Sequence, residues 1–137
     1  MSGGCRGALL FCIDYRFHES LRALITELGL DEGGTDVIRV AGSARGIARP
    51  EHPRDRDFIL DQLRKAHALH GVRHFFLVNH EDCRAYGELD VPDSKEELAL
   101  HHRDLREARA IVLDAFDDVQ VEVRFIRSTG VAEVVAC

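Results

Sequence analysis

RGALLFCIDYR, at residues 6–16, is the stretch that decides the fold of this chain. Residues 6–13 form a mostly continuous apolar run, and Asp14 ends that run before a helix could fit. We therefore expect a strand that is buried on both faces, which is typical of a parallel sheet covered by helices. The run VRHFFLVN at residues 72–79 predicts a second strand of the same kind.

Helical and strand patterns alternate along the rest of the chain. Apolar residues recur at helical spacing in three segments, and Ser94 with Glu97 predicts a capping box at the start of the third. The expected helices cover residues 18–28, 54–70 and 94–116, and the other expected strands cover residues 36–41, 120–126 and 131–135. The order β-α-β-α-β-α-β-β predicts a three-layer α/β fold, with an open, mostly parallel sheet of four strands plus a C-terminal antiparallel edge strand.

Composition favours one globular domain, residues 1–137. The 137 residues are 45% hydrophobic and 31% charged, an ordinary balance for a chain that buries a core. A formal net charge of -6 argues against binding nucleic acid or an anionic membrane, since both need a basic patch. There is no apolar run of about 18 residues and no signal-peptide pattern, so we expect no membrane span and a cytoplasmic location.

The four cysteines are scattered, at positions 5, 12, 83 and 137, which argues against a disulfide framework. Two of them lie in polar segments that directly follow a predicted strand. These segments are Cys12-Ile-Asp14-Tyr-Arg16 and His80-Glu-Asp-Cys83. Ligands of open α/β sheets bind beyond the carboxyl ends of the strands, so the two segments converge if their strands are neighbours.

Side-chain alternation adds a second expectation. If the extended chain continues as far as Arg16, the side chains of Cys12, Asp14 and Arg16 share one face. The opposite face would then carry three apolar or aromatic side chains into the core, namely Ile13, Tyr15 and Phe17. The spacing of three between His80 and Cys83 lets both side chains reach one ion from a tight loop or a helical turn.

Two thiolates and one imidazole suit zinc, so we predict one zinc ion per chain, bound by Cys12, His80 and Cys83. Three protein ligands leave a fourth position for water, as in catalytic zinc sites. Asp14 is the acceptor that would orient this water, and Arg16 is the partner that would keep Asp14 ionised. Asp14 could instead bind the ion as a fourth ligand and close the site.

The combined pattern of Cys12-x-Asp14-x-Arg16 and His80-x-x-Cys83, each after a strand, resembles the β-class carbonic anhydrases. DVIRVAG at residues 36–42 also resembles the second strand and Ala-Gly turn of that family. The resemblance implies that the cysteines and the histidine bind zinc. It implies that the aspartate and the arginine are a catalytic dyad that switches the site between water-bound and closed forms. It further implies reversible hydration of carbon dioxide, a small-molecule substrate, to bicarbonate by zinc-bound hydroxide, in a homodimer or higher homo-oligomer.

Two positions depart from the family pattern. Arg84 stands where the family has glycine, and we expect it either to be a solvated surface residue or to contact bicarbonate. Ser43 replaces the family's usual asparagine. The pair His101-His102, which the pattern does not use, is expected on a solvated helix face.

Other functions stay open on the sequence alone. The same site could hydrolyse carbonyl sulfide or carbon disulfide, which are also linear and electrophilic at carbon. A non-catalytic zinc-binding protein with Asp14 as the fourth ligand is another alternative. A thiol redox protein using Cys12 and Cys83 fits less well, because the chain has no Cys-x-x-Cys pair and His80 would have no role.

Overall fold

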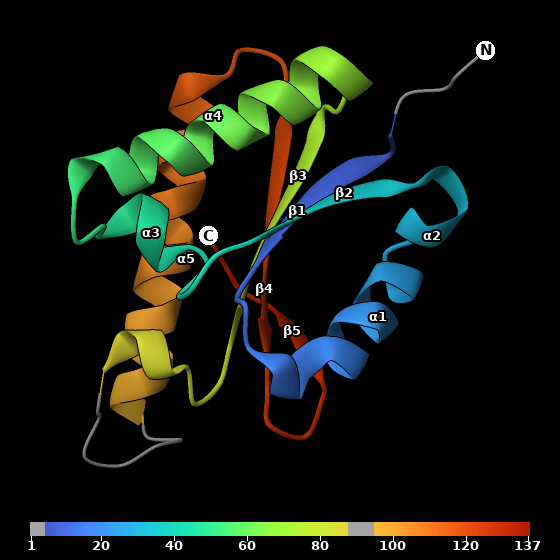
Figure 1. Cartoon of the computed structure of the whole chain (residues 1–137). Coiled ribbons are helices and arrows are strands. Elements are labelled where there is room, and N and C mark those ends of the chain that lie inside the picture. Colours follow the sequence, from blue (N-terminus) through green and yellow to red (C-terminus); the bar gives the residue numbers. More distant parts are fainter. Residues whose placement is uncertain (1–4, 88–94) are drawn as a thin grey trace.

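A computed structural model of the chain describes residues 5–87 and 95–137, and these residues contain a five-stranded sheet (Figure 1). The strands are β1 (Gly7–Phe11), β2 (Thr35–Arg39), β3 (His74–His80), β4 (Gln120–Ile126) and β5 (Ala132–Val134). They lie in the order β2-β1-β3-β4-β5, and every neighbouring pair is parallel except β4 and β5. The predicted sheet, with four parallel strands and one antiparallel edge strand, is confirmed.

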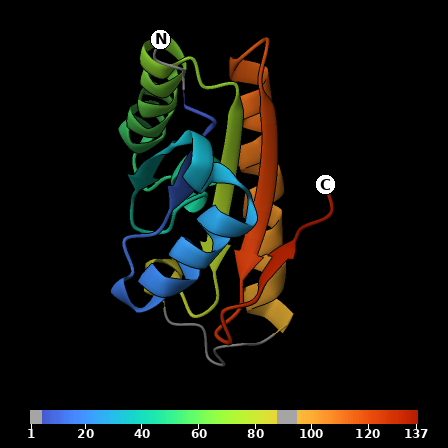
Figure 2. The ribbon, with the colours of Figure 1, turned by 90° about the vertical axis from the view of Figure 1, so that its right-hand side faces the viewer.

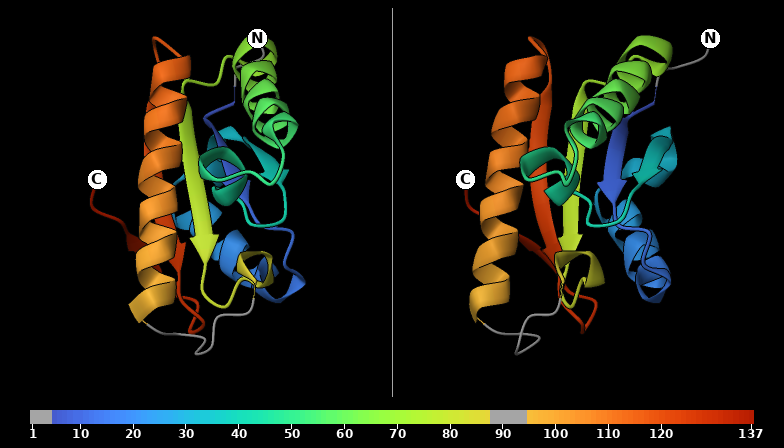
Figure 3. Two further views of the ribbon diagram at one scale, coloured as in Figure 1. Left: turned by 90° about the vertical axis from the view of Figure 1, so that its left-hand side faces the viewer. Right: turned by 60° about the vertical axis from the view of Figure 1, so that its left-hand side comes forward.

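Helices cover both faces of this sheet, which makes the three predicted layers (Figure 3). One face carries α1 (His18–Glu27) and α2 (Leu30–Gly33). The other face carries α3 (Arg45–Ala48), α4 (Pro53–His70) and α5 (Lys95–Ala115). Figure 2 shows the first pair of helices in front of the strands and the long helices beyond them. The structure describes no helix long and apolar enough to cross a membrane.

Strand β1 is buried along its whole length because both of its faces meet a core. Ala8 and Leu10 point into the larger apolar cluster, under α3, α4 and α5. Leu9 and Phe11 point into the smaller cluster, under α1 and α2. An alternating strand with two apolar faces needs a helix layer on each side, which is why this stretch of sequence predicts the fold.

The strands that follow β1 in the sequence are added on opposite sides of it. The strand following β1 lies on one side of it, and β3 lies on the other, with Leu10 paired to Leu77. The carboxyl ends of β1 and β3 are therefore adjacent at the point where the strand order switches, which is where open α/β sheets bind their ligands. The adjacency on which the predicted site depends is present.

One part of the prediction is wrong. The extended chain ends at Phe11, and residues 15–17 form a short 3-10 turn, η1 (Tyr15–Phe17), so alternation does not continue to Arg16. Phe17 is buried as expected, but Ile13 and Tyr15 are 60% and 77% exposed. Ile13 lies between the end of β1 and the turn, and within the turn successive side chains rotate by about 120° instead of 180°, so the alternation that would bury Ile13 and Tyr15 is absent.

Other differences are local. The chain after β2 contains the short helix α3, which is not among the expected helices because its Gly- and Arg-rich sequence shows no apolar periodicity. A short 3-10 turn, η2 (Arg84–Tyr86), follows Cys83. Ser94, the predicted cap of the third long helix, lies outside the described residues.

Candidate metal centre

The carboxyl ends of β1 and β3 bring Cys12, His80 and Cys83 together. Cys12 directly follows β1, His80 is the last residue of β3, and Cys83 precedes η2. One ligand atom from each lies within 4.8 Å of the other two, and all three residues are buried. Cys12 thus forms one compact group of potential metal ligands with two residues that lie 68 and 71 positions later in the sequence.

The distance between the two sulfurs fits a shared metal ion. Cys12 Sγ and Cys83 Sγ are 3.8 Å apart. Two tetrahedral zinc–sulfur bonds of about 2.3 Å place their sulfurs about 3.8 Å apart. A disulfide would need about 2.05 Å, so the pair is reduced and spaced as ligands would be.

The imidazole of His80 is oriented for a metal. Its Nδ1 lies 2.8 Å from the carbonyl oxygen of Glu81, which can only accept, so Nδ1 carries the proton and donates it. Nε2 is then the unprotonated nitrogen, and it is buried with no hydrogen-bond partner among the described residues. The rings of Phe11 and Phe17 pack against the imidazole at centroid distances of 5.6 and 4.2 Å. A buried nitrogen lone pair with no donor is the expected signature of a metal ligand.

Asp14 and Arg16 meet beside this group through the 3-10 turn. Asp14 caps the turn by accepting from the Arg16 backbone N–H at 2.9 Å, and its two carboxylate oxygens accept from the guanidinium, the shortest contact being 2.6 Å. The guanidinium also donates to the side chain and the carbonyl of Asp82, at 3.1 and 2.9 Å. The hydrogen bonds from Arg16 hold the pKa of Asp14 at about 2. Asp14 is therefore ionised, and its Oδ2 lies 3.7 Å from His80 Nε2.

Arg39 is a residue near the site that sequence reasoning missed. It ends β2 opposite Phe11, and its guanidinium donates to the carbonyls of Cys12 and Asp14 at 2.8 and 3.1 Å. The same group lies 2.7 Å from Nδ1 of His18. Arg39 thus ties down the backbone between the first sulfur and the carboxylate. An arginine inside a β-branched strand was the only available signal.

The loop after β2 contacts the Cys12 sulfur through a backbone hydrogen bond. The Gly42 N–H donates to Cys12 Sγ at 3.5 Å, and Gly42 has the left-handed φ of 83°. A Cβ at this position would lie 3.2 Å from the Cβ of Ala85, so glycine meets both a conformational and a steric requirement. Ser43 follows with φ 49°, and its buried hydroxyl donates to the Leu10 carbonyl at 3.3 Å.

A buried polar network lies behind the metal ligands. The amide oxygen of Asn79 accepts from the Ala44 N–H at 3.0 Å, and its NH2 group donates to the Tyr86 hydroxyl and to His101 Nδ1 at 2.8 and 2.9 Å. Asn79 therefore joins the loop after β2, the turn after Cys83 and helix α5. The predicted solvated face is wrong for His101, which is fully buried, and burial lowers its pKa to about 3.

The two thiols cannot both ionise easily without a cation. The hydrogen bond from Cys83 lowers the pKa of Cys12 to about 4, with help from the Gly42 N–H. The same hydrogen bond, the burial of Cys83 and the charge on Cys12 raise the pKa of Cys83. A divalent cation between the sulfurs would remove this repulsion and release the Cys83 proton, so the donor set fits zinc.

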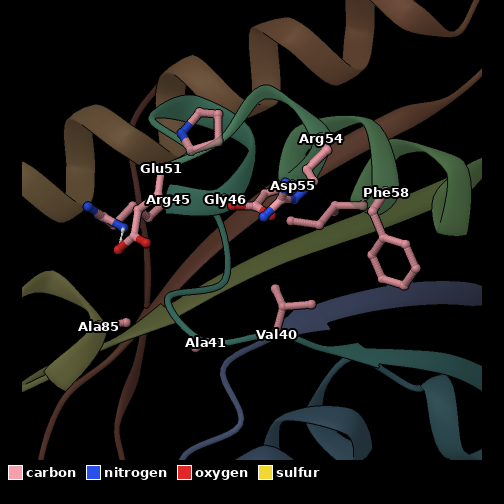
Figure 4. Close-up of a pocket in the computed structure, with 11 residues that line it drawn as sticks. Val40, Ala41, Arg45, Gly46, Glu51, Arg54, Asp55, Phe58 and Ala85 are labelled. Carbon is pink, nitrogen blue, oxygen red and sulfur yellow. Dashed lines mark ion pairs between the residues drawn. The ribbon is translucent and has the colours of Figure 1, made fainter.

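A pocket of 730 Å³ lies among the loop after β2, helices α3 and α4, and the turn after Cys83 (Figure 4). Val40 and Phe58 supply apolar walls, and Arg45 and Glu51 form an ion pair at its rim, 3.8 Å apart. Ala41, also on its lining, is adjacent to Gly42, and lining residue Ala85 follows Cys83 by two positions. The pocket thus reaches the loop whose Gly42 N–H donates to Cys12 Sγ and the turn that follows Cys83, while the three candidate ligands are not part of its lining. Arg84, which directly follows Cys83, is exposed.

Comparison with known proteins agrees with this arrangement. Residues 2–136 match the family described as "Putative carbonic anhydrase". An uncharacterized protein of Rickettsia conorii is 24% identical over 129 residues, covering 91% of this chain and 69% of the relative. A carbonic anhydrase of Streptococcus mutans shares the fold with a TM-score of 0.68 and 19% identity, and β-carbonic anhydrase isoform I of Trichomonas vaginalis does so with 0.67 and 17%. Each structural match covers 98% of this chain and 84% of the other.

Proposed function

Because the chain belongs to the carbonic anhydrase family that residues 2–136 match, we propose that it catalyses the reversible hydration of carbon dioxide to bicarbonate with one zinc ion at the Cys12 centre. The observation that carries this proposal is the convergence of the Cys12 and Cys83 sulfurs with the free His80 Nε2. These three atoms would hold the ion. When bound, zinc would supply Lewis acidity and lower the pKa of a water molecule.

Asp14 is the group placed to handle the proton of that water. Its carboxylate is ionised and lies 3.7 Å from the histidine ligand, so it can accept a hydrogen bond from a water at the centre. Arg16 keeps both carboxylate oxygens on one side through its hydrogen bonds, which orients the acceptor and prevents its protonation. Asp14 positions the nucleophile, and Arg16 positions Asp14.

The same ion pair favours an open site over the non-catalytic alternative. In that alternative Asp14 would be the fourth metal ligand, and its oxygens would have to leave Arg16. Both oxygens accept from the guanidinium, and Asp82 holds the guanidinium from the other side. An exchangeable water in the fourth position is therefore the arrangement we propose.

The pocket beside the centre suits a small uncharged substrate. Its walls include Val40 and Phe58, and its four charged members, Arg45, Glu51, Arg54 and Asp55, are two of each sign, with Arg45 and Glu51 paired at 3.8 Å. Carbon dioxide is apolar and linear, so such walls would admit it more readily than an ion. Carbonyl sulfide and carbon disulfide share these properties, and relative turnover on the three substrates distinguishes them.

We also propose a homodimer that covers the entrance of the site. Ile13 and Tyr15 are exposed beside the metal ligands, and exposed apolar side chains at a site are typical of an interface. A second subunit over these residues would exclude water from the centre. Sedimentation as a monomer at high concentration would contradict the homodimer.

The test compares Asp14→Ala with Asp31→Ala, an exposed acidic residue of α2. Zinc content and the rate of carbon dioxide hydration are measured on both zinc-loaded variants. We expect Asp14→Ala to keep its zinc and lose most of its turnover, while Asp31→Ala retains both. Unchanged turnover in Asp14→Ala would remove Asp14 from the mechanism, and a Cys12→Ser variant that still bound zinc at the centre would refute the ligand set.

A further inference from the structure

We propose that Cys5, Asp36 and His70 form a second zinc site at the opposite end of the sheet. Cys5 precedes β1, Asp36 lies in β2 and His70 ends α4. One ligand atom of each lies within 4.8 Å of the other two, which makes this the second such group in the described part of the chain. This site goes beyond the proposed function, which uses only the first group.

The distances within this cluster suit a metal with little movement. Cys5 Sγ lies 3.6 Å from Asp36 Oδ1, and tetrahedral zinc bonds to sulfur and oxygen impose about 3.6 Å. His70 Nδ1 lies 2.7 Å from the other carboxylate oxygen, Asp36 Oδ2, a hydrogen-bond distance about 0.7 Å shorter than zinc bonds to nitrogen and oxygen impose. The imidazole must therefore swing outward slightly, and the side chain of His70, 52% exposed, has room to do so.

The backbone holds the three ligands independently of any metal. The Cys5 N–H donates to the His70 carbonyl at 3.0 Å, which links the start of β1 to the end of α4. Asp36 pairs with Ala8 in the parallel ladder of β1 and β2. Because main-chain bonds bring the ligands together, less conformational entropy is lost when an ion binds.

The donor set identifies the ion by its chemistry. A thiolate, an imidazole and a carboxylate together favour a borderline divalent cation such as zinc over magnesium or calcium, which prefer oxygen alone. On binding, the Cys5 S–H bond breaks, the sulfur bonds to the metal, and the proton leaves to solvent. Hollows of 220 and 420 Å³ adjoin the cluster, the first lined by Asp36 and His70 and the second by Cys5, so water can complete the coordination.

The two centres are separate. Cys5 and Cys12 lie at opposite ends of β1, seven residues apart, which corresponds to roughly 20 Å of extended chain. No ion can bridge them, and substitution in one leaves the ligands of the other in place. Zinc binding at each can therefore be counted separately.

The experiment is elemental analysis of zinc per chain after dialysis against micromolar free zinc. We expect two zinc ions in the wild type, one in Cys12→Ser, one in His70→Ala and one in Cys5→Ser. His67→Ala is the matched control, because His67 lies one turn earlier in α4 and also contacts an aspartate, Asp118, at 3.0 Å. It should keep two ions. Circular dichroism verifies that each variant is folded.

The outcomes separate this site from the proposed function. If His70→Ala holds as many ions as the wild type, His70 and Asp36 form a simple ion pair and the proposal is refuted. The proposal is also refuted if the wild type binds one zinc ion per chain and only Cys12→Ser lowers that number. A wild-type count of one that only His70→Ala and Cys5→Ser lower would support the second site and contradict the proposed function.

Discussion

Replacing Asn79 with leucine, whose side chain has the same number of heavy atoms, should lower the free energy of unfolding by about 2–4 kcal/mol. Asn79 is 1% exposed, and its amide makes the three hydrogen bonds that join Ala44, Tyr86 and His101. Leucine can make none of them. The perturbation therefore tests whether the network behind the metal ligands stabilises the fold.

The magnitude follows from the groups that leucine would leave behind. The Ala44 N–H would become a buried donor without an acceptor, which costs about 1–3 kcal/mol. Tyr86 and His101 would each lose one hydrogen bond, worth about 0.5–1.5 kcal/mol. These losses belong to one network and do not add fully, so we expect a total of about 2–4 kcal/mol, below the sum of the largest values.

Urea unfolding, followed by circular dichroism at a fixed zinc concentration, measures this difference. With a slope of about 2 kcal/mol per molar, the midpoint of Asn79→Leu should fall by about 1–2 M while the slope stays unchanged. Gln120→Leu is the control, because Gln120 is exposed on β4 and its replacement should change stability by less than about 0.5 kcal/mol. A loss below about 1 kcal/mol in Asn79→Leu would show that the amide is not the support that its contacts indicate.

Three further predictions concern the centre itself. Arg16 lowers the pKa of Asp14 to about 2 in the folded state. The ionised Asp14 therefore stabilises the fold at a pH above the ordinary aspartate pKa, and this contribution is lost as the pH falls from about 4 to 2. Asp14→Asn should therefore remove about 1–2 kcal/mol of the acid-induced loss of stability, measured by urea unfolding across that pH range; an unchanged pH profile would contradict the role of Arg16. Zinc binding should release at least one proton, because the pKa of Cys83 is raised beside Cys12. Chelators should therefore remove zinc more readily as the pH falls, which competition with a chromophoric chelator measures. A zinc affinity that did not change with pH would contradict this prediction. Gly42→Ala should destabilise the protein by about 1–3 kcal/mol, more than Gly29→Ala does. Both glycines have a positive φ, but only at position 42 would a new Cβ crowd Ala85. Thermal unfolding measures both variants, and equal shifts in their midpoints would refute the steric part of this account.

The structure also explains why one inference succeeded for an incorrect reason. Asp14 and Arg16 meet, but a 3-10 turn brings them together and not an extended strand. Local alternation predicted the same pairing because both geometries let residues two apart interact. The difference shows in Ile13 and Tyr15, which are exposed instead of buried.

The sequence by itself determined the five strands and the three longer helices, α1, α4 and α5, because buried apolar runs and helical periodicity depend on residues close together in the chain. It also located the ligand candidates Cys12, His80 and Cys83 at strand ends. Tertiary structure alone decided that β1 and β3 are neighbours, and so that the sulfurs lie 3.8 Å apart. It likewise decided the contacts of Arg39 and Asn79, since each polar side chain finds partners on elements distant in sequence. Composition and spacing carry no record of such partners, because burial and hydrogen bonding depend on how the layers pack.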